Sequence, residues 1–318
     1  MMPLSQSHLS HLDTCLRKYQ YVFLDALLGP STYEQHLTTQ WGSQFHLLMQ
    51  QQALDLPVGV LSQVNTGMSN SLAALEKAAP EVFSYLPESQ VPNSQTEPSS
   101  QHGSVSFSQS EHRRTLEFNG FLLTVVYDLL VTSPSGIPNQ PCEHLIKGQI
   151  FDWKTHQHPP KREWLQKDWQ TRLYLYVLCE TSDLSPEQIA ITYWFVRVGD
   201  QPDTPLIETV PLETSQIREL QPDLSQPSCY RFSYTMTQHE QTRTDLRRLT
   251  HCLTEMMETS DFPKVDIKKG YCDRCPFNAR CERVASSQIR PEGNGQDPAK
   301  IIKAARQLTA ETVDEIPF

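Results

Sequence analysis

The segment Gly148-Gln-Ile-Phe-Asp-Trp-Lys154 has the composition of a short buried strand, yet it carries an acid and a lysine near its end. Side chains alternate between the two faces of a strand, so Asp152 and Lys154 are expected to lie on one face. An acid and a lysine at this spacing are also common on ordinary sheet surfaces. The segment therefore becomes informative through what precedes and follows it in the chain.

A second acid interrupts the β-rich segment that precedes this strand. Residues 114–132 are dominated by apolar side chains, and Asp128 stands among them. A buried carboxylate without a partner costs on the order of several kcal/mol, so the simplest explanation is a strand end or edge that faces water. The alternative is that Asp128 and Asp152 lie on neighbouring strands and together bind Mg²⁺ or Mn²⁺, which prefer oxygen ligands. Lys154 would then position or deprotonate an attacking water.

The hydrophobic pattern of the rest of the chain predicts a mixed α/β fold. Residues 4–54 have helical periodicity, broken at Gly29-Pro30-Ser31, whereas residues 88–112 are polar and predict a flexible insert. Strands are predicted over 114–132, 144–154 and 188–198, with a shorter one over 205–210, and helices over 161–181 and 238–258. Helices followed by a β-β-α-β order predict a mixed sheet flanked by helices.

The bulk composition limits the classes of function. The chain has 318 residues, a net charge of −10 and eight cysteines. Its longest apolar run is too short to span a bilayer, and no secretory signal is apparent, so we expect no membrane association and a cytoplasmic location. The acidic balance argues against nonspecific coating of nucleic acid but allows a local basic groove. No G-x-x-x-x-G-K-[ST] loop is present, so the chain is not expected to be a helicase.

The acids and the lysine belong to a larger pattern. Asp128, the run Asp152-Trp153-Lys154 and a following helix with Gln170 and Tyr174 resemble the PD-(D/E)XK nucleases. They are most similar to the RecB-like branch, which also contains AddB and the CRISPR adaptation nucleases. The resemblance implies a restriction-endonuclease-like mixed sheet flanked by helices, with these catalytic residues: Asp128, Asp152, Lys154, Gln170 and Tyr174. Residues at i and i+4 share a helix face, so Gln170 and Tyr174 can both point at the site.

The same branch carries an upstream histidine in a G-x-x-x-H context, and Gly42-Ser-Gln-Phe-His46 matches it. Taken alone, a helical histidine is more often a surface or core residue than a ligand. The resemblance implies a Mg²⁺ or Mn²⁺ site formed by His46, Asp128, Asp152 and the backbone carbonyl of Trp153. One position departs from the family, because Val125 stands where a glycine often precedes the first aspartate.

The cysteines near the C-terminus form a second pattern. Cys272-x2-Cys275-x5-Cys281 supplies three thiolates, whereas a tetrahedral zinc or a cubane cluster needs four. Cys15 resembles the N-terminal cysteine of the same nucleases, although Leu16 replaces the usual proline. The resemblance implies a [4Fe-4S] cluster held by these four cysteines, and zinc is the rival metal. Such a cluster would close a very long loop, so its loss should loosen the fold.

These patterns favour a metal-dependent DNA nuclease in repair or recombination, acting as an exonuclease or flap-processing enzyme on single-stranded DNA. One alternative is a non-catalytic iron–sulfur subunit for DNA binding or assembly in a helicase–nuclease complex. Another is a zinc-stabilised protein of unrelated activity. Basic residues interleaved with tryptophans near the motifs are compatible with DNA binding. The C-terminal Val313-Asp-Glu-Ile-Pro-Phe318 resembles the acidic tip of bacterial single-stranded-DNA-binding proteins, and predicts a separate helicase or repair protein as partner.

The same observations suggest how the chain is divided. Residues 1–87 form an N-terminal helical part with Cys15 and His46, and residues 88–112 form the insert. The remaining parts are the nuclease core over 113–262, the cysteine segment over 263–285 and a polar tail over 286–318.

Overall fold

A computed structural model of the protein describes residues 1–27, 29, 33–58, 66–86, 107–137, 145–156, 159–197 and 226–283. The chain divides into two compact units, Met1–Val265 and Asp266–Phe318. The strand predicted over 205–210 and the acidic tip at 313–318 lie outside the described residues. None of the described helices is long and apolar enough to cross a membrane.

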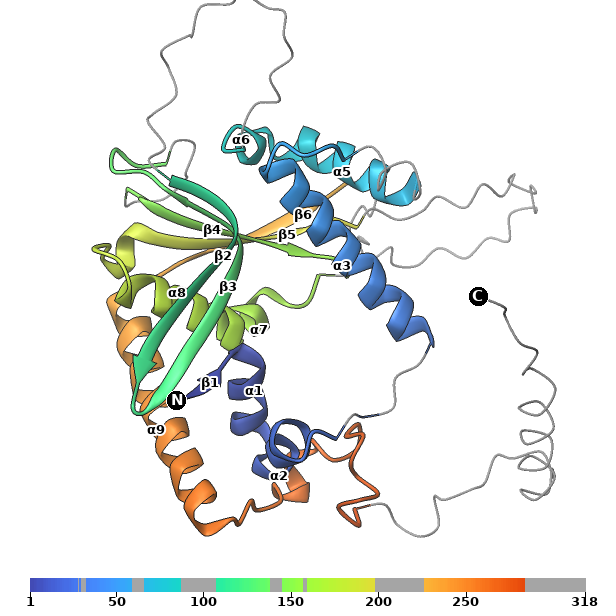
Figure 1. Ribbon diagram of the computed structural model, residues 1–318, viewed down its shortest axis with the longest axis vertical. Coiled ribbons are helices and arrows are strands. Elements are labelled where there is room, and N and C mark those ends of the chain that lie inside the picture. The colour runs from blue at the N-terminus through green and yellow to red at the C-terminus, as the bar shows by residue number, and fades with distance from the viewer. Residues whose placement is uncertain are drawn as a thin grey trace, which may run out of the picture. The chain divides into compact units, whose positions relative to one another are not determined.

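A six-stranded mixed sheet forms the centre of the first unit (Figure 1). Its strands follow the order β1-β3-β4-β5-β6, and β2 pairs with β3 beside this path. Their bounds are β1 Met2–Leu4, β2 Phe107–Phe118, β3 Phe121–Thr132, β4 Gly148–Lys154, β5 Ile189–Phe195 and β6 Ser228–Ser233. β1–β3 and β4–β5 are parallel, and the other pairs are antiparallel. The predicted mixed α/β fold is thus confirmed.

β2 and β3 form a long hairpin that the sequence pattern did not predict. Its turn is Asn119-Gly120, and both residues have positive φ, 49° and 81°. Asn-Gly is the preferred pair for such a turn, because both residues tolerate the left-handed backbone. β2 begins at Phe107, inside the segment predicted to be a flexible insert, so that prediction is wrong from Phe107 onward. The polar residues that suggested a loop belong to β2, in which every residue is partly or fully exposed.

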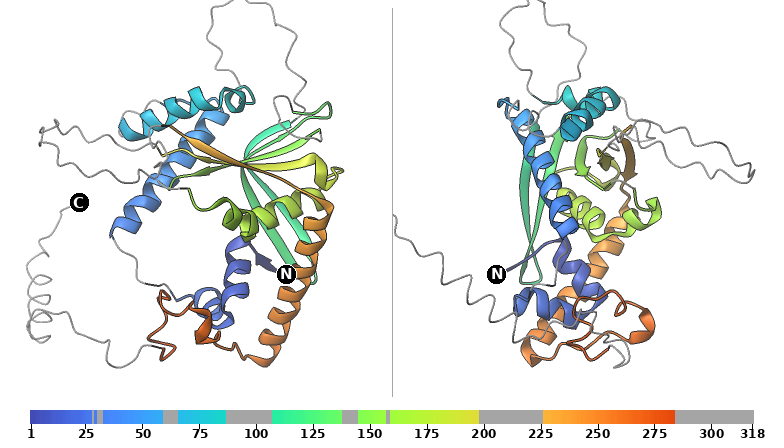
Figure 2. Two further views of the ribbon diagram at one scale, coloured as in Figure 1. Left: turned by 180° about the vertical axis from the view of Figure 1, so that it is seen from behind. Right: turned by 90° about the vertical axis from the view of Figure 1, so that its right-hand side faces the viewer.

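Helices cover both faces of the sheet (Figures 1 and 2). On one face, residues of α1 (Gln6–Thr14), α8 (Trp169–Glu180) and α9 (Met236–Thr259) share an apolar core with β3, β4 and β5. On the other face, a second core includes α3 (Tyr33–Ala53), α5 (Thr66–Ala78) and α6 (Pro80–Phe83). The alternation of side chains changes near Asp128, since Tyr127 and Leu130 both belong to the first core.

The region predicted as one helix over 161–181 consists of two helices. α7 (Arg162–Lys167) ends at Asp168, whose backbone is extended with φ −64° and ψ 144°. The Asp168 side chain accepts a hydrogen bond of 2.8 Å from the Gln170 backbone N–H and so caps α8. Aspartate is a favoured N-cap because it satisfies a free N–H of the first helical turn. This cap sets where α8 begins and therefore where Gln170 lies.

The remaining short elements complete the two units. α2 (Leu16–Tyr19) and a π-helical turn, η1 (Gln20–Leu24), follow α1 in the first unit, and a 3-10 turn, η2 (Pro186–Gln188), precedes β5. In the second unit, the described part contains η3 (Ile267–Lys269) and the turns that carry the three C-terminal cysteines.

Candidate active site

The structure brings the predicted site residues of the first unit together from four elements. His46 comes from α3, Asp128 from β3, Asp152 and Lys154 from β4, and Gln170 and Tyr174 from α8. A cavity of about 700 Å³ opens at this place, and its lining includes His46, Asp128 and Tyr174.

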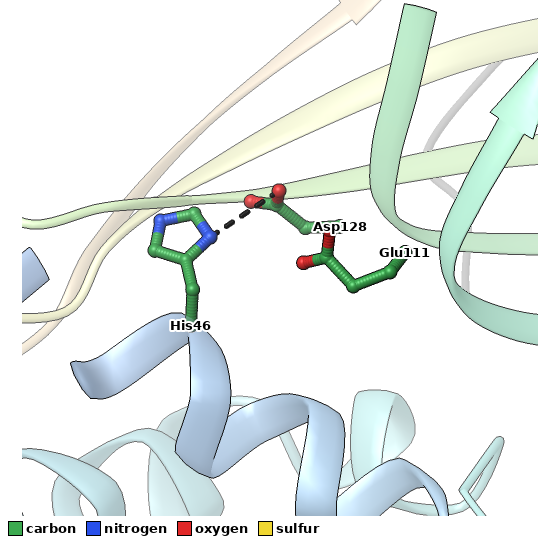
Figure 3. A group of neighbouring side chains, drawn as sticks. All are labelled: His46, Glu111 and Asp128. Atoms are coloured by element: carbon green, nitrogen blue, oxygen red, sulfur yellow. Dashed lines mark ion pairs between the residues drawn. The ribbon is translucent and has the colours of Figure 1, made fainter. Parts of the chain in front are cut away.

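Asp128 is buried, and each of its two carboxylate oxygens contacts another residue. Asp128 is only 8% exposed. The explanation that it stands at a strand end or edge facing water is therefore wrong. Its Oδ2 atom accepts a hydrogen bond of 2.7 Å from the backbone N–H of Trp153. Its Oδ1 atom lies 3.3 Å from Nδ1 of His46, and Figure 3 marks this ion pair by a dashed line. Burial disfavours the charged imidazole, but the hydrogen bond and negative charge of Asp128 outweigh it and raise the pKa of His46.

Asp152, Lys154 and Gln170 form a closed polar triad. The Lys154 Nζ atom lies 2.6 Å from Asp152 Oδ1 and donates a hydrogen bond of 2.7 Å to Gln170 Oε1. Gln170 Nε2 in turn donates to Asp152 Oδ2 at 2.5 Å. The alternation predicted for β4 therefore places the acid and the lysine on one face, and the amide from α8 fixes both.

Burial has a strong electrostatic effect on this triad. Asp152 is only 2% exposed. Desolvation raises the pKa of its carboxyl to about 6, because it outweighs the opposing charge of Lys154 while Asp128 adds to the rise. Among the described residues, no hydrogen-bond donor is aligned with the buried Oδ1 atom, and the Lys154 ammonium is its close polar contact. An oxygen in this state has lone pairs available for a cation.

Tyr174 lines the cavity and is buried, at 4% exposure. Its ring packs edge-on against Tyr127, with centroids 5.3 Å apart, and the Tyr127 hydroxyl donates to the Tyr174 carbonyl at 3.1 Å. Burial and the two site carboxylates hold the pKa of Tyr174 well above its usual range. The phenol therefore stays protonated and can act as a hydrogen-bond donor.

Gly42 allows α3 to approach the segment that follows β4. A Cβ atom at this position would lie 2.9 Å from Oγ1 of Thr155, which is closer than real Cβ contacts. Gly42 precedes His46 by about one helical turn, so the glycine and the histidine lie on one helix face. The G-x-x-x-H spacing thus has a physical basis here, since the small residue lets the helix deliver the imidazole.

Glu111 is a site residue that the sequence analysis missed. Its carboxylate, His46 and Asp128 each offer a metal-ligating atom, and these atoms lie within 4.8 Å of one another (Figure 3). Burial and the negative charge of Asp128 raise the pKa of Glu111. The residue falls in the segment taken for an insert, so only recognition of Asn119-Gly120 as a hairpin turn would have placed it opposite Asp128.

The family of the chain follows from a comparison with models of known protein families. A model of the PD-(D/E)XK nuclease superfamily matches residues 3–282. The chain belongs to this superfamily. A solved structure of a provisionally assigned exonuclease from Eubacterium rectale is also similar, with a TM-score of 0.44, 10% sequence identity and coverage of 90% of each chain. No curated protein matches the chain.

PD-(D/E)XK nucleases use divalent metals, and the residues of this nuclease fit that requirement. The ligand atoms of His46, Glu111 and Asp128 are gathered in one place, and Asp152 presents a buried oxygen without an aligned donor. Carboxylate oxygens with one imidazole form a donor set suited to Mn²⁺ and acceptable to Mg²⁺.

The predicted cluster cysteines are divided between the two units of the nuclease. Cys15 lies between α1 and α2 with an extended backbone, φ −162° and ψ 113°. In the second unit, Cys275 N–H donates to the Cys272 carbonyl at 3.1 Å, and Cys281 N–H donates to the Phe277 carbonyl at 2.9 Å. All four thiols are half-buried and none forms a disulfide. The iron–sulfur cluster stays a prediction.

Proposed function

We propose that this nuclease hydrolyses phosphodiester bonds of DNA, as an exonuclease or flap-processing enzyme on single-stranded DNA in repair or recombination. The observation that carries the proposal is the closed triad of Asp152, Lys154 and Gln170 beside Asp128. A purely structural sheet would gain little from burying two carboxylates near each other, because desolvation of each is costly.

The residues have distinct roles in this proposal. His46, Asp128, Asp152 and the carbonyl of Trp153 would hold Mg²⁺ or Mn²⁺. When bound, such an ion stabilises negative charge on the phosphate and lowers the pKa of bound water. Lys154 holds a proton near the attacking water, and Gln170 keeps the lysine in place through its carbonyl oxygen. Tyr174 supplies a neutral hydroxyl donor in the lining of the cavity.

The test is a cleavage assay on end-labelled single-stranded and duplex DNA with Mg²⁺ or Mn²⁺. Wild type should cleave, whereas Asp152→Ala and Lys154→Ala should not. An exposed lysine of α5, Lys77→Ala, serves as the matched control. Equal activity in all of these proteins would contradict the proposal. Tight DNA binding without metal-dependent cleavage would instead support the alternative of a non-catalytic DNA-binding or assembly subunit.

The cofactor proposal extends to a [4Fe-4S] cluster held by Cys15, Cys272, Cys275 and Cys281. Its support is the family resemblance of the one-plus-three cysteine spacing, together with the half-burial of all four cysteines. The cluster would have a structural role. A helicase or repair protein bound by the acidic tip, and a cytoplasmic location, remain predictions from the sequence.

A further inference from the structure

We propose that Glu111 is an additional ligand of the divalent cation, beyond the set that the family resemblance implies. The inference rests on the proposed function, because it concerns the same centre. Three observations carry it: the position of Glu111 in the hairpin, the surroundings of its carboxylate, and its distance from the other ligand atoms.

The hairpin register places Glu111 opposite Asp128. Ser110 pairs with Leu129 and His112 pairs with Tyr127, so Glu111 and Asp128 face each other across the two strands. Directly opposed residues of an antiparallel pair project to the same face of the sheet. The two acids therefore meet because of the strand register, although no regular pairing is present at this step.

The backbone is irregular at the point where Glu111 faces Asp128. Glu111 has a left-handed backbone with φ +50°, an uncommon conformation for a residue with a Cβ atom. The Ser110 hydroxyl donates a hydrogen bond of 2.9 Å to the Asp128 carbonyl, so that this buried oxygen stays satisfied. The Asp128 backbone carbonyl therefore keeps a hydrogen-bond partner although the regular strand pairing is interrupted here.

Within the described part of the chain, the position of the Glu111 carboxylate is not explained by a hydrogen-bond or ion-pair partner. Among the described residues, no hydrogen bond or ion pair joins it to another group; its electrostatic neighbours are Asp128, which repels it, and His46. Its oxygen nevertheless lies within 4.8 Å of the ligand atoms of both. Two carboxylates and an imidazole at such distances are mutually compatible when a divalent cation lies between them.

The consequence is a centre with one more anionic ligand than the resemblance implies. Ligand charge is a main determinant of the affinity of oxygen-rich cation sites. Glu111 belongs to β2, so cation binding should also stabilise the β2–β3 hairpin.

The decisive measurement is Mn²⁺ binding, followed by electron paramagnetic resonance of the free ion, for wild type, Glu111→Gln and Glu117→Gln. Glu117 belongs to the same strand and lies opposite Leu122, away from the site. Glu111→Gln should weaken binding by at least about tenfold, since even the loss of a group outside the ligand set typically costs about 10- to 100-fold. Glu117→Gln should bind as wild type does.

Thermal unfolding separates a ligand from a structural residue. In EDTA, Glu111→Gln should melt at or above the temperature of wild type, because the repulsion with Asp128 is relieved. In saturating Mn²⁺, wild type should gain more stability than Glu111→Gln, because a ligand that binds only the folded state stabilises it. A structural residue would lower both melting temperatures.

The outcomes distinguish this inference from the proposed function. If wild type binds Mn²⁺ and cleaves DNA while Glu111→Gln binds Mn²⁺ equally well, Glu111 is not a ligand and the proposed function stands. If wild type neither binds Mn²⁺ nor cleaves DNA, both proposals are wrong.

Discussion

The backbone N–H of Trp153 donates a hydrogen bond of 2.7 Å to the side chain of Asp128, a residue 25 positions earlier in the chain. This bond continues the contact between β3 and β4 just beyond their last regular pair, Leu129 with Phe151. It holds a carboxylate of one strand against the acid-lysine segment of the next. The candidate site therefore depends on a strand pairing as well as on side-chain identity.

The role of this bond can be separated from the charge of Asp128. We expect Asp128→Asn to abolish cleavage with little change in stability, because the side-chain oxygen can still accept from Trp153. Asp128→Ala should abolish cleavage and also lower the free energy of unfolding by about 1–3 kcal/mol, since a buried N–H loses its acceptor. Urea denaturation and the cleavage assay measure the two effects. Equal stability of the Asn and Ala variants would show that the bond contributes nothing.

Gln170 is expected to act as a positioning residue. Replacement by alanine removes the amide that holds both Lys154 and Asp152, so kcat should fall by about 10- to 100-fold, as for other groups that orient site ligands. KM should change less, because the amide need not touch the substrate. The exposed Gln166 of α7 provides the control variant Gln166→Ala. An unchanged kcat in Gln170→Ala would refute the role.

The close approach at Gly42 predicts a compensating pair of substitutions. Gly42→Ala should lower activity, because the new methyl group meets the Thr155 hydroxyl and moves α3 with His46. Thr155→Ala removes the nearest atom, so the double variant should recover much of the activity lost in Gly42→Ala. The double-mutant cycle measures this coupling. Additive effects of the two substitutions would mean that the contact does not position His46.

Trp164 is expected to contribute to binding of single-stranded DNA. Trp164 lies on α7 and is 61% exposed, and Lys167 lies three positions later on the same helix face. Trp164→Ala should weaken binding to an oligothymidylate by about 1–3 kcal/mol, the range for stacking of one base on an aromatic side chain. Duplex binding should change less. The exposed Met236→Ala on α9 is the control, and fluorescence anisotropy in EDTA gives both affinities.

The iron–sulfur prediction can be tested by comparing the loss of a proposed ligand with the loss of a cysteine outside the ligand set. Anaerobically purified wild type should be brown and contain iron and sulfide, whereas Cys275→Ser should lose most of the iron and melt at a lower temperature. Cys252, also half-buried and outside the proposed ligands, provides the control Cys252→Ser. A colourless wild type that contains zinc would instead favour the rival metal.

Much of the site could be predicted from the sequence because the relevant rules are local. The alternation of side chains in a strand places Asp152 and Lys154 on one face, and helical periodicity places Gln170 and Tyr174 together. The break at Asp168 was missed, although an aspartate before a new helical pattern is a recognisable cap. The turn at Asn119-Gly120 was also a local signal, and its omission hid both β2 and Glu111.

The amino-acid sequence by itself determined the class of fold, the shared strand face of Asp152 and Lys154, and the shared helix face of Gln170 and Tyr174, because backbone geometry sets these periods. Only the tertiary structure decided that the Trp153 N–H reaches the Asp128 carboxylate and that α3 comes close enough to deliver His46. Such relationships depend on strand register and on the packing of distant segments. No short stretch of sequence contains that information.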